Sequence, residues 1–369
     1  MSAGHRFDGE QERDVKFSPW IAAGLGAALA LTIAGARRAS ADPEARDRAI
    51  QKLMAGDLSW TATEPLAGPL DQGGDHFYSI KDPSFVWAKG RWHVFCTVRG
   101  KNRPQQIEYL TFKDWSDVGA GERRLLPITD DYFCAPEVFY FAPQKKWCLL
   151  YQYSPGSKVD ANRVPALSTN SDVGNWRGWT KPEPLYDSAS AAAVKFAGSW
   201  IDFWIICDDA NAYLFFTRDN GEMYRAQTRL ADFPRGWSEP VLTIKGDIFE
   251  AGHTYKVKGT DQYLTVIEAL GPGKRYYKAY SAKTLDGEWT PVAATWDKPF
   301  ASQNNVAQPA GQWTESISHG ELFRDGIDQH LEVDPLGLRM LIQGVDAEGY
   351  AKDYGQIPWR LAILQSNLK

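Results

Sequence analysis

This chain of 369 residues has no excess of basic residues, few cysteines and only one long apolar run. Its 41 Lys and Arg are outnumbered by 46 Asp and Glu, which gives a net charge of −5. Because nucleic-acid binding depends on a basic stripe that neutralises phosphates, we expect no nucleic-acid partner. The sequence also lacks a G-x-S-x-G motif, which argues against an α/β-hydrolase. It lacks a phosphate-binding glycine loop between a strand and a helix as well.

Only four cysteines are present: Cys96, Cys134, Cys148 and Cys207. Each lies in or beside a strand-like run, and their spacing does not match a zinc site. We therefore expect buried thiols. In an exported protein, one or two disulfide bonds are the alternative.

The one long apolar run lies at 18–36 and is followed by two arginines and 39-ASA-41. This order predicts residues 1–41 to be a secretory signal that is cleaved after Ala41. The region before the run is not clearly basic, so an uncleaved membrane anchor is the alternative, for which the run is short. Both interpretations predict a secreted or extracytoplasmic protein.

Aromatic residues are abundant, with 15 Trp, 16 Tyr and 17 Phe. Such a content is typical of proteins that stack on sugar rings, and equally of a dense all-β core. Composition alone leaves both interpretations open.

One pattern recurs along the chain: a polar residue, an alternating apolar strand, a turn and a second apolar strand. The copies begin about 50 to 70 residues apart, which is the scale of one propeller blade. No strong amphipathic helical period appears after residue 60. We therefore predict an all-β protein, a five-bladed β-propeller, with a β-sandwich as the alternative. The copies lie at 81–97, 135–153, 200–228, 249–269 and 318–344.

The propeller is expected to form one domain at 75–369. Residues 42–74 are rich in Pro, Gly and Asp and are expected to be a loosely ordered lead-in. We therefore expect no separate carbohydrate-binding module within these residues.

A carboxylate stands near the opening of each copy. Because a propeller brings equivalent ends of its inner strands to one axial channel, we expect these groups at one mouth of that channel. Several acids in an aromatic-rich pocket suit glycoside hydrolysis, in which one carboxylic acid protonates the leaving oxygen. A second carboxylate activates water or attacks the sugar. The five residues are Asp82, Glu137, Asp202, Glu250 and Glu321.

Three of these residues are candidates for distinct roles. Glu250 has apolar residues before it and Ala-Gly after it, which favours a protonated acid. Asp82 follows Lys81, whose charge favours the ionised form that a base needs. Asp202 lies in an aromatic strand and is a candidate for tuning the acid. Each has a plainer interpretation: turn initiation by Asp-Pro for Asp82, strand-end capping for Asp202 and a solvated edge strand for Glu250.

A series of motifs between about Phe77 and Leu364 resembles glycoside hydrolase family 62. The motifs are long and occur in order over nearly the whole exported chain. They are KDP at 81–83, APEVFYFAPQKKWCLLYQY at 135–153, the strand pair at 200–228, FEAGHTYKV at 249–257, TLDGEWTPV at 284–292, ISHGE at 317–321 and DYGQIPWRLAIL at 353–364.

The resemblance implies an α-L-arabinofuranosidase that acts on arabinoxylan and arabinan, with the five-bladed fold that the related family 43 shares. It implies an inverting mechanism, with Asp82 as the general base and Glu250 as the general acid. Asp202 then corresponds to the residue that raises the pKa of the catalytic acid and orients it. Lys81 corresponds to a residue that lines the arabinose pocket, and Tyr354 to a tyrosine at its rim.

Two positions depart from the family pattern. Gly355 stands where the family usually has Asn, which puts one sugar contact in doubt and affects the subsite for the xylan backbone. GHT at 252–254 replaces other polar residues, so substrate preference is also expected to differ.

His319, in the ISHGE motif, is either a hydrogen-bonded core histidine or a metal ligand. The resembling families hold a calcium ion in the axial channel through a histidine and waters, so a structural calcium is a possible cofactor, with Gln343 as a candidate neighbour. Calcium prefers oxygen ligands, so water would have to complete its shell. No cofactor is expected for catalysis.

The expected partner is the polysaccharide arabinoxylan, and no stable protein partner is implied. The alternatives to an arabinofuranosidase are a family 43-like β-xylosidase or arabinanase, and a sugar-binding propeller without catalysis. All three matched carboxylates are present, which favours an enzyme.

Overall fold

A computed structural model describes residues 42–218 and 220–368 of the protein. The predicted signal or anchor at residues 1–41 lies outside the described residues. Within the described ranges, no helix is long and apolar enough to cross a membrane.

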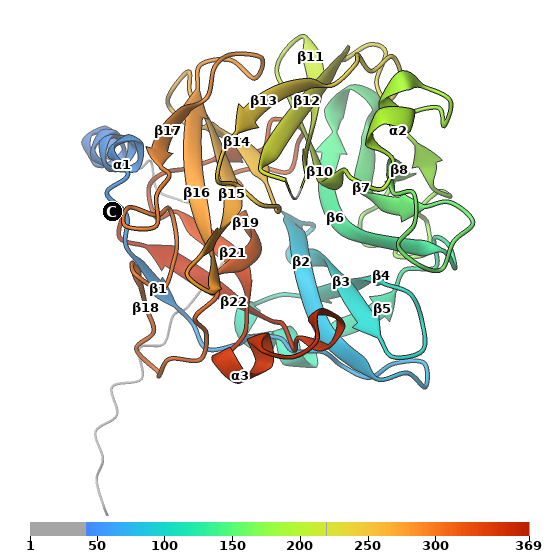
Figure 1. The fold of residues 1–369 in the computed structure, drawn as a ribbon. Helices are drawn as coiled ribbons and strands as arrows, with labels where there is room; N and C mark the ends of the chain where they lie inside the picture. The colour runs from blue at the N-terminus through green and yellow to red at the C-terminus, as the bar shows by residue number, and fades with distance from the viewer. Residues whose placement is uncertain (1–41, 219, 369) are drawn as a thin grey trace, which may run out of the picture. The chain divides into compact units, whose positions relative to one another are not determined.

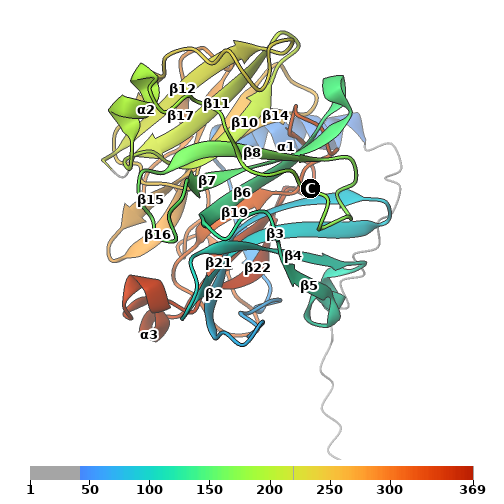
Figure 2. The same ribbon diagram turned by 90° about the vertical axis from the view of Figure 1, so that its right-hand side faces the viewer.

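Five sheets form the blades of a β-propeller, which confirms the predicted fold (Figure 1). Three blades follow in simple chain order, and Figure 2 shows the strands of the second blade above those of the first. The first consists of β2 (Phe77–Ala88), β3 (Arg91–Gly100), β4 (Gln106–Phe112) and β5 (Glu122–Leu125). The second consists of β6 (Tyr132–Phe141), β7 (Lys146–Ser154), β8 (Val164–Asn170) and β9 (Glu183–Pro184). The third consists of β10 (Ile201–Cys207), β11 (Asn211–Arg218), β12 (Glu222–Arg229) and β13 (Val241–Lys245).

The last two blades are completed by strands from elsewhere in the chain. The fourth contains β14 (His253–Val257), β15 (Tyr263–Gly271), β16 (Lys274–Ala282), β17 (Thr290–Ala293) and β20 (Glu332–Val333), which pairs in parallel with β14. The fifth contains β19 (Ser318–Leu322), β21 (Arg339–Gly344), β22 (Arg360–Ser366), β1 (Trp60–Ala62) and β18 (Val306–Ala307). Since β1 pairs antiparallel with β22, the two ends of the described chain join in one blade and close the ring.

The segment 42–74 is not a loosely ordered lead-in. Asp42 caps helix α1 (Pro43–Ala55), and Gly56 ends the helix in the left-handed conformation. This helix buries Ala49 and Leu53 and lies beside β17 (Figure 1). Strand β1 then enters the fifth blade, so the propeller begins before residue 75. The expectation failed because a three-residue strand carries too little periodicity to be recognised.

The remaining helices are short. They are α2 (Ala191–Phe196), α3 (Ala347–Tyr350) and three 3₁₀ turns, η1 (Trp115–Ala120), η2 (Ala142–Gln144) and η3 (Tyr354–Gln356). The last of these turns carries Tyr354 to the rim of the site described below.

Most aromatic side chains belong to the core between and within blades. Trp115, Trp200, Trp204 and Trp359 are fully buried. Among the described residues, Trp87 and Tyr354 are the aromatic side chains that are largely exposed. The aromatic content therefore reflects dense packing more than sugar stacking. All four cysteines are buried free thiols.

Inner strands β2, β6 and β10 each contain a bulge, at which pairing with the second strand shifts register. The bulge residues Asp82, Ala135 and Asp202 have φ of 49°, 51° and 52°, and Ala251, just before β14, has 54°. A bulge leaves a backbone N–H outside the ladder, and a buried N–H needs another acceptor.

In all five blades, a side chain of the preceding blade accepts the N–H at this position. We call these five hydrogen bonds the bulge contacts. They run from Asp82 N to Gln343 Oε1 (2.8 Å), Ala135 N to Thr97 Oγ1 (2.8 Å), Asp202 N to Gln152 Oε1 (2.9 Å), Ala251 N to Asp202 Oδ2 (2.9 Å) and His319 N to Glu268 Oε2 (2.9 Å).

Candidate active site

The three predicted catalytic carboxylates line one cavity at the end of the inner strands. Asp82, Asp202 and Glu250 are 4%, 7% and 7% exposed, and the cavity between them measures about 130 Å³. The bulges explain how the two aspartates reach it, because a left-handed backbone turns their side chains out of the sheet toward the axis. The structure thus brings together residues that are more than 160 positions apart in the chain.

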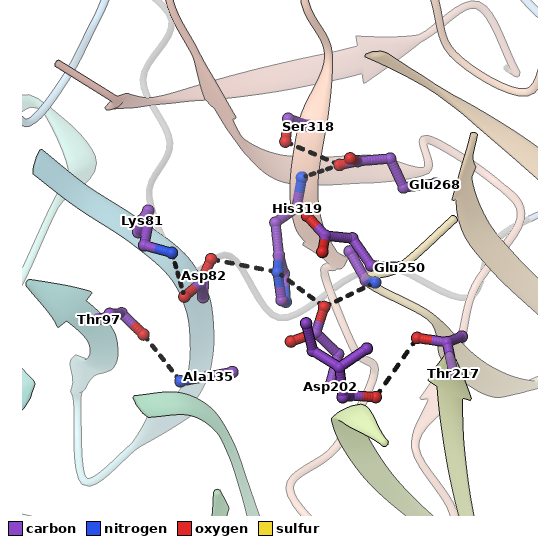
Figure 3. A network of polar contacts seen from close by, with 12 residues as sticks. Lys81, Asp82, Thr97, Ala135, Asp202, Thr217, Glu250, Glu268, Ser318 and His319 are labelled. Atoms are coloured by element: carbon purple, nitrogen blue, oxygen red, sulfur yellow. Dashed lines mark hydrogen bonds and ion pairs between the residues drawn. The ribbon is translucent and has the colours of Figure 1, made fainter. Parts of the chain in front are cut away.

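Asp82 lies between two cationic groups. Its Oδ2 is 3.4 Å from Lys81 Nζ, and its Oδ1 is 3.2 Å from His319 Nδ1 (Figure 3). Burial raises the pKa of Asp82, but Lys81 and His319 lower it by more, so its pKa lies well below the ordinary value. This carboxylate is therefore held in its ionised form near neutral pH, as a general base requires.

Asp202 has the opposite character. Burial, together with the charges of Glu250 and Asp82, raises the pKa of Asp202 to about 7, although His319 and the Ala251 N–H oppose the change. Its Oδ2 accepts the Ala251 N–H at 2.9 Å and lies 3.7 Å from His319 Nδ1 (Figure 3). Asp202 is therefore held directly beside the backbone that carries Glu250.

Glu250 is fixed by a buried arginine that sequence reasoning missed. Arg275 Nη1 lies 2.5 Å from Glu250 Oε1 and 2.7 Å from Glu268 Oε1. Arg275 comes from β16, the third strand of the fourth blade, and is 5% exposed. A charged residue inside the buried pattern of 275-RYYKAY-280 was the available signal, since such a residue needs a buried partner.

His319 lies between the two aspartates and is almost completely buried. Burial lowers the pKa of His319, but Asp82 and Asp202 raise it by more, to about 9. The imidazolium form therefore joins the two carboxylates at neutral pH. This geometry fits a positioning group, and it commits Nδ1 to the two carboxylates.

Lys81 and Tyr354 also line the cavity. Lys81 Nζ is 5.7 Å from the centre of the Tyr354 ring, which is 57% exposed at the rim. Gln343, the predicted neighbour of His319, accepts the Asp82 N–H and donates to Ser318 Oγ at 3.1 Å. It therefore sets the backbone of the proposed base.

Glu137 and Glu321 do not reach the cavity, contrary to the expectation that all five carboxylates would meet. Both are fully buried beyond the bulge. Glu137 Oε2 accepts the Ile205 N–H at 2.6 Å, and Glu321 Oε2 accepts the Phe85 N–H at 3.1 Å. They join neighbouring inner strands because the bulges, invisible in the sequence, shift which face each later residue occupies.

The GHT motif at 252–254 packs behind the site and does not line it. A side chain at Gly252 would collide with the Trp204 ring, and Thr254 Oγ1 accepts from Trp204 Nε1 at 2.9 Å. This departure from the family pattern is thus a packing adjustment around Trp204.

A buried pair of polar atoms lies deeper in the channel. Glu137 Oε1 and His253 Nδ1 are 3.9 Å apart, and neither has a hydrogen-bond partner among the described residues. The His253 ring centre is 6.2 Å from that of His319. The described residues contain no group of three or more His, Cys, Asp or Glu that could hold a metal. The pair therefore supplies one oxygen and one nitrogen, so water would have to provide most of a calcium shell.

Comparison with known proteins matches this chain and its fold to a family. The family model of Glycosyl hydrolase family 62 covers residues 59–365. A curated relative, α-L-arabinofuranosidase C of Cellvibrio japonicus, is 36% identical over 319 residues. That alignment covers 85% of this chain and 48% of the relative, so the chain spans about half the length of that protein.

Solved structures agree with the family match. The catalytic domain of a Coprinopsis cinerea family 62 α-L-arabinofuranosidase is 38% identical, with a TM-score of 0.78 over 84% of this chain and 97% of that one. A Podospora anserina α-L-arabinofuranosidase, solved with cellotriose, is 36% identical, with a TM-score of 0.77 over the same shares. A thermostable family 43 hydrolase shares the fold at 16% identity, with a TM-score of 0.54 over 81% of this chain and 91% of that one.

The fold and the family define the class: this is a glycoside hydrolase built on a five-bladed β-propeller. More narrowly, the chain belongs to glycosyl hydrolase family 62.

Proposed function

We propose that this protein is an inverting α-L-arabinofuranosidase that removes arabinofuranose side chains from arabinoxylan. The observation that carries the proposal is the convergence of Asp82, Asp202 and Glu250 on one small cavity. The named family 62 relatives are α-L-arabinofuranosidases, and another family 62 hydrolase, 34% identical to this chain, was solved with xylotriose. A xylan backbone in this protein would therefore lie outside the cavity, with the furanose inside it.

In this mechanism, Asp82 takes a proton from a water molecule that attacks the anomeric carbon. Glu250 gives a proton to the glycosidic oxygen as the bond to the xylan breaks. Asp202 and His319 hold the two groups in position, and Lys81 contacts the bound furanose. The Tyr354 ring forms the rim that the polymer approaches.

The balance of buried charges around Glu250 favours one protonated carboxyl group. The four carboxyl groups of the network face three cationic groups, Lys81, Arg275 and His319. Because a buried uncompensated carboxylate is costly, one carboxyl group favours the protonated form near neutral pH. Burial raises the pKa of Asp202 to about 7, so Asp202 is the carboxyl group of this set that binds a proton near neutral pH. The four carboxyl groups of this network are Asp82, Asp202, Glu250 and Glu268.

The decisive experiment separates the acid from the base. Glu250→Gln should lower kcat on arabinoxylan by roughly 10²- to 10⁴-fold, and much less on 4-nitrophenyl α-L-arabinofuranoside, whose leaving group needs little protonation. Asp82→Asn should lower both rates, since the attacking water is needed for either substrate. Released arabinose is measured by chromatography and its initial anomeric configuration by proton NMR.

Glu239→Gln, at an exposed position, is the matched control and should behave as the parent. Thermal unfolding verifies that each variant is folded. Equal turnover of arabinoxylan by Glu250→Gln and the parent would overturn the proposal. Release of xylose or arabino-oligomers by the parent would instead support the family 43-like alternatives.

Calcium on the axis is part of the proposal, supported by the unpartnered atoms of Glu137 and His253. An ion there would stabilise the meeting point of the inner strands and take no part in the reaction. Removing it with EDTA should lower the melting temperature, and added Ca²⁺ should restore it. An unchanged melting temperature, with no Ca²⁺ found by elemental analysis, would contradict this.

Export is also proposed, because a polymeric substrate must be met outside the cytoplasm. N-terminal sequencing of the protein from culture medium would test cleavage after Ala41. Recovery only from the membrane fraction would support an anchor at 18–36.

A further inference from the structure

A second and larger depression adjoins the cavity. It measures about 660 Å³ and shares Gln105, Tyr132, Asp160 and Tyr354 with the smaller one. The loop between β3 and β4 forms one wall, and the loop after β7 forms another. We call this depression the outer groove. It is where a polymer chain would continue beyond the furanose pocket.

The outer groove is strongly cationic in a protein whose net charge is −5. Four of its lining residues are basic and one, Asp160, is acidic. Some of these charges are already compensated, because Arg103 pairs with Asp75 at 3.4 Å and Asp160 pairs with Arg163 at 2.6 Å.

Three cations remain, Arg99, Lys101 and Lys158. No acidic side chain among the described residues lies within ion-pair distance of them. Lys101 and Lys158 are exposed, whereas Arg99 is half-buried.

Arg99 occupies a defined place at the junction of the two depressions. A Cβ atom on Gly355 would lie 2.7 Å from Arg99 Nη2 and 2.9 Å from its Cζ. The guanidinium therefore lies flat against the backbone next to Tyr354, in space that any side chain at 355 would take. The absence of a side chain at Gly355 therefore lets the Arg99 guanidinium lie at the edge of the cavity.

We propose that the outer groove recognises a hemicellulose whose backbone carries uronic acid units. This inference rests on the proposed function, since it names the form of arabinose-bearing polymer that the site takes. A neutral backbone of xylose offers hydroxyl groups, which do not require three uncompensated cations. A carboxylate on the sugar matches them, because guanidinium binds carboxylate with two parallel hydrogen bonds.

The test compares two substrates that differ only in charge. One is a glucuronoarabinoxylan, and the other is the same polymer after its uronic acids are reduced to neutral sugars. The ratio of kcat/KM on the acidic polymer to that on the reduced one should be roughly 5 to 10 for the parent at low salt. Because exposed charges are screened, the ratio should fall as NaCl rises to about 0.5 M.

Neutralising the groove should remove the preference. In the triple variant Arg99→Gln, Lys101→Gln and Lys158→Gln, the ratio should fall to about 1. Lys113→Gln, at the opposite end of β4, is the matched control and should keep the parent's ratio. Gly355→Ala keeps every charge but displaces the Arg99 guanidinium, so it should lower the ratio part of the way.

A binding measurement keeps this inference separate from the proposed activity. Glucuronoxylan without arabinose is cast into a native gel, and retardation of the parent is compared with that in a gel of carboxyl-reduced polymer. Stronger retardation by the acidic polymer, lost in the triple variant, supports the groove even if no arabinose is released from any substrate. Equal retardation by both polymers, or an equal loss on both in the triple variant, overturns the inference.

Discussion

At the scale of single residues, Arg275 determines where the proposed acid lies. Its guanidinium is shared between Glu250 and Glu268 and contacts the Phe249 ring at 5.1 Å from the ring centre. Removing it as Arg275→Met leaves two buried carboxyl groups without a cation. We expect a loss of about 3–5 kcal/mol in unfolding free energy, measured by urea denaturation.

Arg275→Lys distinguishes charge from position. It restores the charge, so it should recover most of the stability, but it lacks the fork that reaches both carboxyl groups. The kcat on arabinoxylan should therefore remain low, with a shifted pH profile and little change in KM. Full recovery of kcat in the lysine variant would show that Arg275 does not position Glu250.

A second residue links stability to pH. His93 on β3 is 3% exposed; its Nε2–H donates to Ala88 O at 3.2 Å, and its Nδ1 accepts from Tyr109 Oη at 2.7 Å. Burial lowers the pKa of His93 to about 4, below its usual 6.5. Above pH 6.5 the ring is neutral in both the folded and unfolded states. As the pH falls from 6.5 to 4 the unfolded chain takes up the proton first, which costs the folded state roughly 3 kcal/mol.

The corresponding variant is His93→Gln, which does not titrate. Its unfolding free energy should decline less steeply than that of the parent between pH 6.5 and 4. Ser188→Gln, at an exposed position without a titratable side chain, is the control and should retain the parent's slope. Parallel curves for His93→Gln and the parent would rule out the assigned role.

The repeated strand pattern led us to expect five carboxylates at one cavity, and the structure places three of them there: Asp82, Asp202 and Glu250. The pattern did not identify Glu268 or Arg275, which lie on the second and third strands of the fourth blade, respectively. The roles of Glu268 and Arg275 depend on which polar groups of other strands lie next to them in the folded protein. That information is three-dimensional, so alternation along one strand cannot contain it.

At the scale of elements, the bulges convert a regular propeller into an active site. The pattern of a hairpin predicts a strand but not the residue at which its pairing changes register. Apolar and polar residues still alternate before and after a bulge, so the bulge leaves no clear mark in the sequence. The strands and their turns were therefore predictable, whereas the burial of Glu137 and Glu321 was not. The bulge contacts show what makes this shift in pairing tolerable: each buried N–H outside the ladder has a side-chain acceptor from the preceding blade.

Thr97 offers a test of a bulge contact at the level of stability. It is fully buried, and its Oγ1 accepts the Ala135 N–H at 2.8 Å (Figure 3). Thr97→Val keeps the shape but removes this acceptor and also the hydroxyl that hydrogen-bonds Asp82, so it should cost about 1–3 kcal/mol of unfolding free energy. Thr243→Val, on the outermost strand β13, should cost much less. Urea unfolding of both variants measures the difference, and equal midpoints would contradict the importance of the contact.

At the scale of the whole molecule, the ring depends on a three-residue strand from the start of the described chain. Trp60 on β1 is 2% exposed, and its Nε1 donates to Phe300 O at 2.6 Å. The five-blade architecture could be predicted from the repeat, but this closure could not. The fifth copy looked complete in the sequence because β19, β21 and the strand near the C-terminus already form a sheet.

The closure can be tested with two truncated chains. A chain that begins at Asp57 lacks α1 and therefore loses the burial of Leu53 and the ion pair of Arg46 with Asp334. A chain that begins at Glu64 also lacks β1, which removes Trp60 and leaves β22 as an open edge. Because losing a buried tryptophan costs about 3–5 kcal/mol, the second chain should melt on the order of 10 °C below the first.

Open strand edges also promote association, so the shorter chain should form soluble aggregates that the longer one does not. Differential scanning calorimetry and size-exclusion chromatography measure the two effects. If both chains had the same melting temperature and remained monodisperse, β1 would contribute little to the stability of the fifth blade. If the shorter chain alone fails, the ring is held shut by β1, and the distance between Asp82 and Glu250, which lie on different blades, depends on a strand remote from both.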